Sequence, residues 1–354
     1  MRVLIVDIYY EAFLDTHYAE RPELRDASYD EQLAALLDRQ FGTGDAYSRE
    51  LRALGHEAQE IIPNARPLQA AWASEHGRAR IGRAAARLPT RIGAAARQAL
   101  SHRIVAAQIA EFRPDVVYCQ DLWYFTRPEL DALRRKGMLV VGQIASEAPP
   151  EGRLRGFDLI LTSFPHYVER FRAAGVSSEY FAIAFDQTVP DRLRGSTAPD
   201  APREHGAVFV GGVNPAVHPA GTALMERLCG ELDLDLWGYG ADRLAPGSPI
   251  LAHHHGEAWG LEMYEVLTSA KVVVNRHIEA AEGNANNMRL FEATGCGAAL
   301  VTEAAPNLAE LFEPDREVAT YRDEDELVAK VQEHLAAEHP GREYDRESIL
   351  FMAS

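Results

Sequence analysis

The fold is decided by the stretch Asn284-Ala-Asn-Asn-Met-Arg-Leu-Phe-Glu-Ala-Thr-Gly-Cys-Gly-Ala-Ala-Leu-Val-Thr302, because it joins a polar loop to a helix and then to a buried strand. A loop that leads into a helix leaves backbone N–H groups free at the amino end of that helix, where a phosphate gains from these donors and from the helix dipole. We expect the helix over 287–294, with Glu292 about one and a half turns into it and with Gly295 and Gly297 at its end. The stretch therefore predicts an anion site beside a strand of a parallel sheet.

Length and composition indicate an ordinary globular protein. The chain has 354 residues, of which 47% are hydrophobic and 25% are charged. At roughly 150 residues per domain, this length favours two domains. The formal net charge of −17 argues against a nucleic-acid partner, because a phosphate backbone requires a basic surface. A local basic pocket for a smaller anion remains compatible with this charge.

The cysteines and the apolar segments indicate a soluble cytoplasmic protein. Cys119, Cys229 and Cys296 are odd in number and lack paired spacing, so they predict neither a disulfide framework nor a zinc site. The apolar run after Met1 is too short for a signal peptide, and no stretch reaches the roughly 18 apolar residues of a membrane span. The sequence leaves the oligomeric state open.

Short β-branched runs alternate with amphipathic stretches in both halves of the chain, which predicts two α/β domains with parallel sheets. We expect an N-terminal domain over 1–190 and a C-terminal domain over 205–340, with a Pro- and Ser-rich linker over 187–204 and a helix at about 341–354 that packs back on the first domain. Two such domains place a cleft between them, and open α/β sheets bind ligands at the carboxyl ends of their strands. The expected strands are 3–7, 58–62, 115–119, 139–142, 159–162, 179–182, 207–210, 232–237, 272–275, 298–302 and 317–321.

Two glycine-containing loops are further candidates for ligand contacts. Gly42-Thr-Gly44 precedes a helix with Asp45 as its expected N-cap, which forms a second candidate anion site. The third glycine of a dinucleotide fingerprint is missing, so NAD is not expected. Gly211-Gly212 follows a strand directly, and glycines there permit close approach of a ligand to the backbone. A plain tight turn is the alternative interpretation.

Basic side chains after the strand 272–275 suggest charge near a phosphate. Arg276, His277 and Arg289 are candidates to stabilise a leaving diphosphate without a metal. The alternative for Arg289 is a surface ion pair with a neighbouring side chain. The run His253-His254-His255 does not predict a metal site, because adjacent histidines point in different directions on a regular backbone.

The C-terminal half resembles a known family over about 140 residues. The runs 258–271, Asn275-Arg-His277, Asn287-Met-Arg-Leu-Phe-Glu-Ala-Thr-Gly-Cys-Gly297 and 310–321 are similar to the C-terminal domain of GT-B glycosyltransferases. The nearest branch is the CgeB-like, spore-maturation-protein-like one, which is related to retaining family-4 enzymes. The N-terminal half matches only in outline. The resemblance implies two Rossmann-like domains, with a nucleotide-sugar donor held by the second and an acceptor by the first.

Site residues follow from this resemblance. Glu292 matches the second Glu of the Glu-x7-Glu pattern, which accepts hydrogen bonds from the ribose, whereas the first Glu is replaced by Asn284. The Arg and Lys expected after the first strand of the C-terminal domain are also absent, so Arg276 and Arg289, with Asp121 in the first domain, are the expected catalytic residues. The expected donor-binding residues are Gly211, Gly212, Asn214, His254, Asn284, Asn286, Asn287 and Glu292. The expected acceptor-binding residues are Gly42, Gly44, Trp123, Tyr124 and Ser146.

The predicted function is transfer of a sugar from a nucleoside-diphosphate sugar to an acceptor hydroxyl, independent of metal and cofactor and with retention of configuration. Asp121 or Asp7 would act as general base if the configuration were inverted. Two alternatives stay open: a non-catalytic GT-B-like partner protein, and a nucleotide-sugar epimerase. The sugar, the base and the acceptor are not specified by the sequence.

The segment 66–103 is basic in an otherwise acidic chain, with eight arginines and a single acid. The simpler interpretation of this segment is a solvated Ala- and Arg-rich helix. The alternative is a basic amphipathic surface that contacts a membrane or an acidic acceptor, with Trp72 as the only aromatic anchor. We do not expect membrane contact.

Overall fold

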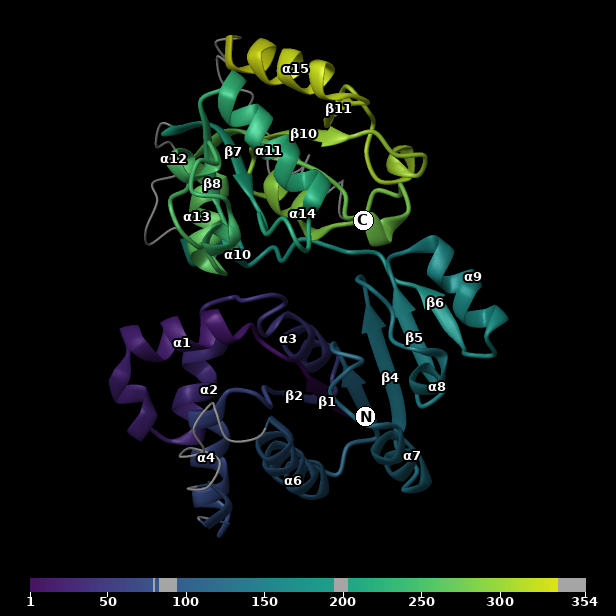
Figure 1. The fold of residues 1–354 in the computed structure, drawn as a ribbon. Coiled ribbons are helices and arrows are strands. Elements are labelled where there is room, and N and C mark those ends of the chain that lie inside the picture. The colour runs from purple at the N-terminus through teal and green to yellow at the C-terminus, as the bar shows by residue number, and fades with distance from the viewer. Residues whose placement is uncertain (79, 83–93, 194–202, 337–354) are drawn as a thin grey trace. The chain divides into compact units, whose positions relative to one another are not determined.

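A computed structural model describes residues 1–78, 80–82, 94–193 and 203–336, and it divides into two compact units (Figure 1). The first unit is Met1–Phe181 and the second is Ala182–Ser354. The helix expected at 341–354 lies outside the described residues.

Unit 1 contains a six-stranded parallel sheet with the strand order β2-β1-β3-β4-β5-β6. Every pair of neighbouring strands is parallel, as the register of Val3 opposite both Ala58 and Val116 illustrates. The strands are β1 (Arg2–Val6), β2 (Glu57–Ile61), β3 (Val116–Cys119), β4 (Leu139–Ile144), β5 (Leu159–Thr162) and β6 (Ser178–Tyr180).

Helices cover both faces of this sheet, which is why β1 is buried along most of its length. Tyr47 and Leu51 of α3 pack on the face that carries Val3 and Ile5, and α6 also contacts β1. The helices are α1 (Glu11–Glu20), η1 (Pro22–Asp26), α2 (Tyr29–Leu37), α3 (Ala46–Ala53), α4 (Arg66–Glu75), α6 (Ala94–Phe112), α7 (Arg127–Arg135), α8 (Glu151–Leu154) and α9 (Pro165–Ala173).

Unit 2 contains a five-stranded parallel sheet with the order β11-β10-β9-β7-β8. Numbered within its own unit, this order is the same 2-1-3-4-5 sequence that unit 1 shows. The strands are β7 (His205–Val210), β8 (Leu234–Trp237), β9 (Ala270–Asn275), β10 (Ala299–Glu303) and β11 (Ala319–Tyr321). The prediction of two α/β units with parallel sheets is therefore confirmed.

The two faces of the unit 2 sheet carry separate cores. Ala207, Val272 and Val274 pack with α11 and α15 on one face, whereas Val208 and Val273 pack with α13 and α14 on the other. The elements are α10 (Val189–Leu193), α11 (Pro219–Glu231), η2 (Ala241–Arg243), α12 (Ile250–His253), α13 (Leu261–Ser269), η3 (Glu279–Ala281), α14 (Met288–Gly295), η4 (Leu308–Glu310) and α15 (Glu324–Ala336).

Two segments differ from the sequence-based expectation. The helix α1 was not predicted, and the first part of the expected linker forms α10 instead. Val189 and Leu193 stand one helical turn apart and are buried in the core beneath α13 and α14, which explains the helix. The remainder of that segment, 194–202, lies outside the described residues.

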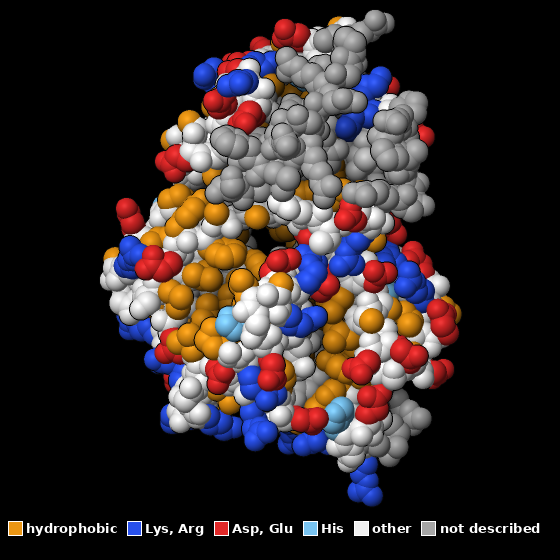
Figure 2. Space-filling model, turned by 180° about the vertical axis from the view of Figure 1, so that it is seen from behind, with side chains coloured by type: hydrophobic (Ala, Val, Ile, Leu, Met, Phe, Trp, Pro, Cys, Tyr) orange, Lys and Arg blue, Asp and Glu red, His pale blue; other side chains and the backbone are white. Residues whose placement is uncertain are grey.

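The basic segment 66–103 forms α4 and the first part of α6, and its Arg83, Arg87 and Arg91 lie outside the described residues. Trp72 is 5% exposed and stacks on His76, so its ring is not available as a membrane anchor. In the described part of the chain, no helix is long and apolar enough to cross a membrane. The face in Figure 2 shows acidic and basic side chains interspersed.

A buried histidine of α1 makes the stability of unit 1 depend on pH. His17 is fully buried between Phe13 and Tyr18, and neither ring nitrogen has a partner among the described residues. Burial, with the nearby charge of Arg39, lowers the pKa of His17 to about 4. Between pH 6.5 and 4 the unfolded chain therefore binds a proton at His17 that the folded chain does not bind. The free energy of unfolding is highest above pH 6.5 with respect to this group and decreases as the pH falls toward 4.

We predict that His17→Phe weakens this acid sensitivity. The wild type should lose about 2 kcal/mol of unfolding free energy through His17 between pH 6.5 and 4. Urea titrations of both proteins across that range measure the difference. Equal pH slopes for the two proteins would contradict the prediction.

Candidate functional site

The carboxyl edge of the unit 2 sheet is the candidate site. Strand order reverses between β7 and β9, and ligands of open α/β sheets bind outside the carboxyl ends of strands at such a point. Gly211 follows β7 directly, and Arg276 follows β9 directly. The amino end of α14 lies at the same edge, because its N-cap residue Asn287 contacts the last residue of β9.

Asn287 ties α14 to the sheet. Its Nδ2 donates to Oδ1 of Asn275 at 2.8 Å and to the carbonyl of Arg276 at 3.0 Å, while its Oδ1 accepts from the N–H of Leu290 at 3.3 Å. Asn275 is 3% exposed and in turn donates to Oγ1 of Thr302 at 2.9 Å. One side chain therefore caps the helix and fixes its position against the strand.

The loop before α14 leaves donors without acceptors. The N–H groups of Met288 and Arg289 donate to no acceptor among the described residues, as expected for the first turn of a helix. Nδ2 of Asn286, a residue only 5% exposed, and Nε of Arg289 are buried and also lack partners within the described chain. Buried donors without partners are rare in proteins, so this loop fits an acceptor-rich ligand.

The backbone of the same loop is held rigidly. Asn307 accepts from the N–H of Ala285 at 2.7 Å and donates to its carbonyl at 3.0 Å. Nδ2 of Asn284 donates to the carbonyl of Ala281 at 2.9 Å, so this amide is engaged by its own loop. Asn275 and Asn307 were not among the predicted site residues; the position of Asn275 at the end of a Val-Val-Val strand was the available signal.

Glu292 lies in the second turn of α14, as predicted, and is 6% exposed. Its Oε2 accepts from Nη1 of Arg289 at 2.6 Å, and its Oε1 accepts from the hydroxyl of Tyr264 at 3.4 Å. Nη1 of Arg289 also lies 2.9 Å from Sδ of Met263. The alternative for Arg289 was a surface ion pair; an ion pair is present, but it is largely buried.

Arg276 and Arg289 are held on different faces of the sheet. Arg276 forms an ion pair with Glu279 at 3.2 Å, and its Nη1 lies 3.4 Å from the position that a Cβ of Gly221 would occupy in the first turn of α11. Arg289 packs toward α13. The structure thus places Arg276, but not the guanidinium of Arg289, beside the amino end of α11.

His277 does not supply positive charge. It is 5% exposed, its Nε2 donates to the carbonyl of Glu303 at 3.1 Å, and burial lowers its pKa below the usual 6.5. The ring is therefore neutral at pH 7, and the prediction of a cationic His277 is wrong because the residue is packed into the core instead of reaching solvent.

The glycine pair after β7 lies in close contact with protein side chains. A Cβ at Gly212 would lie 2.6 Å from Cζ of Tyr239, and one at Gly211 would lie 2.8 Å from Cζ of Phe209. Tyr239 also contacts His218, whose Nε2 lies 3.1 Å from its hydroxyl. The alternative interpretation, a tight packed turn, accounts for both glycines without a ligand.

Asn214 and His254 lie on loops near this turn. Oδ1 of Asn214 accepts from the N–H of Ala216 at 3.0 Å, and Nε2 of His254 donates to the carbonyl of Gly238 at 2.8 Å. Neighbouring His255 instead contacts Asp235. The described residues contain no group of three or more His, Cys, Asp and Glu side chains that could hold a metal ion.

In unit 1, the loop with Gly42 and Gly44 lies at the carboxyl edge of its sheet. Both glycines have positive φ, at 59° and 50°, and Thr43 exchanges hydrogen bonds with Gln120 after β3 at 3.0–3.2 Å. Asp45 occupies the N-cap position of α3 but makes no capping bond, because its carboxylate pairs with Arg49 at 2.8 Å. The expected capping role of Asp45 is therefore wrong.

The other predicted residues of unit 1 differ in accessibility. Oδ1 of Asp121 accepts from the N–H of Trp123, whose side chain is 50% exposed beneath Arg153. The hydroxyl of Tyr124 is engaged by Ser101 at 2.9 Å. Ser146 is exposed after β4. Asp121 belongs to a different unit from the two arginines with which it was predicted to act.

Asp7, at the end of β1, has an unusual carboxyl group. Burial, together with the charges of Asp121 and Glu60, raises the pKa of Asp7 to about 7 against the hydrogen bond from the N–H of Ile8. Oδ2 of Asp7 lies 4.0 Å from where a Cβ of Gly42 would stand. A carboxyl that titrates near neutral pH at a sheet edge is a candidate acid or base.

Comparison with known proteins gives a family match over part of the chain. Residues 220–348 match the family model of glycosyl transferase-like proteins, and no curated protein sequence matches the chain. Sucrose-phosphate synthase from Thermosynechococcus elongatus is similar in structure, with 14% identity, a TM-score of 0.55, and coverage of 95% of this chain and 90% of that one.

Two further solved structures are similar in fold. A trehalose-6-phosphate synthase shares 9% identity at a TM-score of 0.52 and covers 99% of this chain and 95% of its own. A glycosyltransferase from Rickettsia africae shares 9% identity at a TM-score of 0.51, with 94% and 87% covered. The fold is the GT-B fold, as the sequence predicted, and the glycosyl transferase-like sequence lies in unit 2.

We predict that Asn287→Ala lowers the unfolding free energy by about 2 kcal/mol, because it removes a cap worth about 1 kcal/mol together with two hydrogen bonds. Asn287→Ser keeps a capping oxygen and should recover about half of the loss. Denaturant unfolding of both variants tests this. Equal stability of Asn287→Ala and wild type would refute the role of Asn287.

We also predict that Asp7→Asn stabilises the protein more at pH 8 than at pH 5. The folded carboxyl keeps its proton up to about pH 7, whereas the unfolded one loses it near 3.8, so the wild type loses stability as the pH rises through this window. The gain should be about 2 kcal/mol larger at pH 8. Unfolding titrations at the two pH values provide the measurement, and a gain independent of pH would show that Asp7 is ionised in the fold.

Proposed function

We propose that the protein is a glycosyltransferase that moves a sugar from a nucleoside-diphosphate sugar, bound by unit 2, to an acceptor hydroxyl bound by unit 1. The observation that carries the proposal is the amino end of α14, where free amides and the buried Nδ2 of Asn286 meet beside the end of β9. A helix amino end with unoccupied donors is a binding site for phosphate oxygens. The glycosyl transferase-like match over 220–348 includes this region.

The donor diphosphate would accept hydrogen bonds from the N–H groups of Met288 and Arg289 and from Asn286. Arg276 stands beside the same helix end through its carbonyl contact with Asn287, and its guanidinium adds positive charge at the amino end of α11. This arrangement would replace the Arg and Lys that related enzymes carry after the first strand. Charge on the leaving diphosphate would then be stabilised without a metal ion.

Glu292 would accept the ribose hydroxyls. Its carboxylate already accepts from Arg289 and Tyr264, and two carboxylate oxygens offer about four acceptor sites, so both bonds persist while a diol binds. Arg289 would act by positioning this carboxylate. That assignment differs from a direct contact between Arg289 and phosphate.

Retention of configuration is the proposed outcome. The similar trehalose-6-phosphate synthase structure concerns glycosyl transfer with retention. The motif Asn287-Met-Arg-Leu-Phe-Glu292 favours the CgeB-like branch. Asp7 and Asp121 are the candidate bases for the inverting alternative, and the raised pKa of Asp7 makes it the stronger of the two. The three unpaired thiols favour the cytoplasm as the compartment.

The proposal predicts that one of UDP, TDP, GDP and ADP stabilises the protein, by about 2.7 kcal/mol at 100 times its dissociation constant. Arg276→Gln and Glu292→Gln should weaken this effect by roughly tenfold to a hundredfold in affinity. Arg316→Gln is the matched control, because Arg316 is 79% exposed and precedes β11 at the opposite edge of the sheet.

Turnover of the corresponding nucleotide sugar then separates the alternatives. Sugar transfer with a retained anomer in the proton NMR spectrum supports the proposal, and an inverted anomer overturns retention. Binding without turnover indicates the non-catalytic alternative. Release of nucleotide from donor in the absence of acceptor, with isomerised sugar, indicates the epimerase. Failure of every nucleotide to stabilise the protein refutes the donor site.

A further inference from the structure

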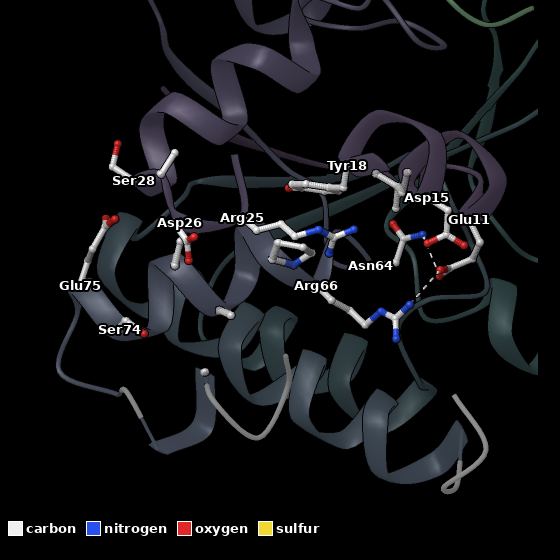
Figure 3. Close-up of a pocket in the computed structure, with 16 residues that line it drawn as sticks. Glu11, Asp15, Tyr18, Arg25, Asp26, Ser28, Asn64, Arg66, Ser74 and Glu75 are labelled. Atoms are coloured by element: carbon white, nitrogen blue, oxygen red, sulfur yellow. Dashed lines mark hydrogen bonds and ion pairs between the residues drawn. The ribbon is translucent and has the colours of Figure 1, made fainter. Parts of the chain in front are cut away.

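Unit 1 contains a groove that the predicted site residues do not touch. It lies between α1, η1 and α4 and has a volume of about 730 Å³ (Figure 3). Ligand pockets commonly measure roughly 300–1,000 Å³, so the groove has the size of a binding site for a small molecule or a short chain. All of its lining residues fall within 11–82, and thus within one unit.

The charged part of the lining consists of arginines and carboxylates, beside hydroxyl and amide groups of Tyr18, Ser28, Asn64 and Ser74. In Figure 3, Arg25 extends toward the middle of the groove and Arg66 extends toward Glu11. Glu11 and Asp15 lie toward one end, and Asp26 and Glu75 toward the other (Figure 3). A guanidinium can only donate hydrogen bonds, and an ionised carboxylate can only accept them. A hydroxyl group does both, so neighbouring hydroxyls can satisfy both kinds of side chain.

Several of these charges lack an ionic partner in the part of the chain that the structure describes. Arg25, Asp15 and Asp26 have no ion-pair partner within the described residues, and Arg25 lies over the ring of Tyr18 at 5.2 Å. Nη2 of Arg66 lies 3.9 Å from Oε2 of Glu11, which is a long distance for an ion pair. The guanidinium of Arg25 is therefore held in place by an aromatic face while its N–H groups remain open to a ligand.

One end of the groove reaches the carboxyl edge of the sheet. Asn64, which follows β2, accepts from the N–H of Tyr9 at 3.2 Å and donates to its carbonyl at 2.6 Å. Tyr9 follows β1 and is two residues from Asp7. The loops after the first two strands are thereby joined at the point where the groove begins.

We propose that this groove is the acceptor subsite and that it takes an uncharged oligosaccharide; this inference rests on the proposed function. The vicinal hydroxyls of such a chain can bridge Arg25 to the carboxylates on either side, while Pro67 and Ala71 offer an apolar wall to its C–H groups. An anionic chain meets four carboxylates, and a cationic chain meets two arginines. A neutral polyol avoids both repulsions.

Binding to an array of immobilised oligosaccharides tests the inference without requiring turnover. The array carries neutral, amino-sugar and uronic-acid chains, and the probe is the labelled full-length protein. Arg25→Ala removes the central donor, and Ala71→Phe fills the groove. Arg21→Ala is the matched control, because it removes an exposed arginine four residues earlier that does not line the groove.

We expect wild type and Arg21→Ala to bind neutral chains. Arg25→Ala should lose roughly tenfold or more in affinity through a lost charge-assisted hydrogen bond, and Ala71→Phe should lose a similar factor because its ring occupies the groove. Unchanged thermal unfolding would exclude misfolding of the variants. Equal binding by all four proteins, binding of only charged chains, or binding of none overturns the inference. Stabilisation of the wild type by nucleotide is measured in parallel. If no nucleotide stabilises the wild type, the proposed function is refuted. If a nucleotide does stabilise it but no neutral chain binds, only the inference about the groove fails.

Discussion

The structure of unit 2 depends on the hydrogen bonds of one buried amide, that of Asn275. The side-chain Nδ2 of Asn275 donates to Thr302 on β10, and its Oδ1 accepts from Asn287 at the start of α14. The backbone carbonyl of Asn275 accepts from the hydroxyl of Tyr321 at the end of β11. A polar group at 3% exposure is costly unless its bonds are made, so these contacts are mutually required. Three strands and a helix are thereby aligned at the edge where the donor is proposed to bind.

The same constraint explains why the proposed anion site is preorganised. Oδ1 of Asn287 caps the helix and Nδ2 of Asn287 bonds to the sheet, so the backbone N–H groups of the next two residues are left directed outward. Asn307 fixes Ala285 from the other side of the loop. Binding to donors that are already in position costs less conformational entropy than binding that must first order a mobile loop.

The two units repeat one strand order but use their sheet edges differently. In unit 2 the edge is rich in N–H donors, with arginines on either face of the sheet. In unit 1 the edge carries Asp7 with its raised pKa, and beyond it the groove with both arginines and carboxylates. This difference in chemistry, on a shared topology, favours an anionic ligand for the second unit and a hydroxyl-rich one for the first.

The sequence by itself determined the two α/β units, most of the strands, the helix over 287–294 and the location of Glu292 on it, because these follow from local hydrophobic periodicity and capping residues. Tertiary structure alone decided which face each side chain serves. Packing against Tyr239 and Phe209 explains Gly211 and Gly212, burial makes His277 neutral, and opposite faces of one sheet separate Arg276 from Arg289. These outcomes depend on residues distant in sequence, which no local pattern encodes; for the same reason the groove between α1, η1 and α4 gave no signal until the chain was folded.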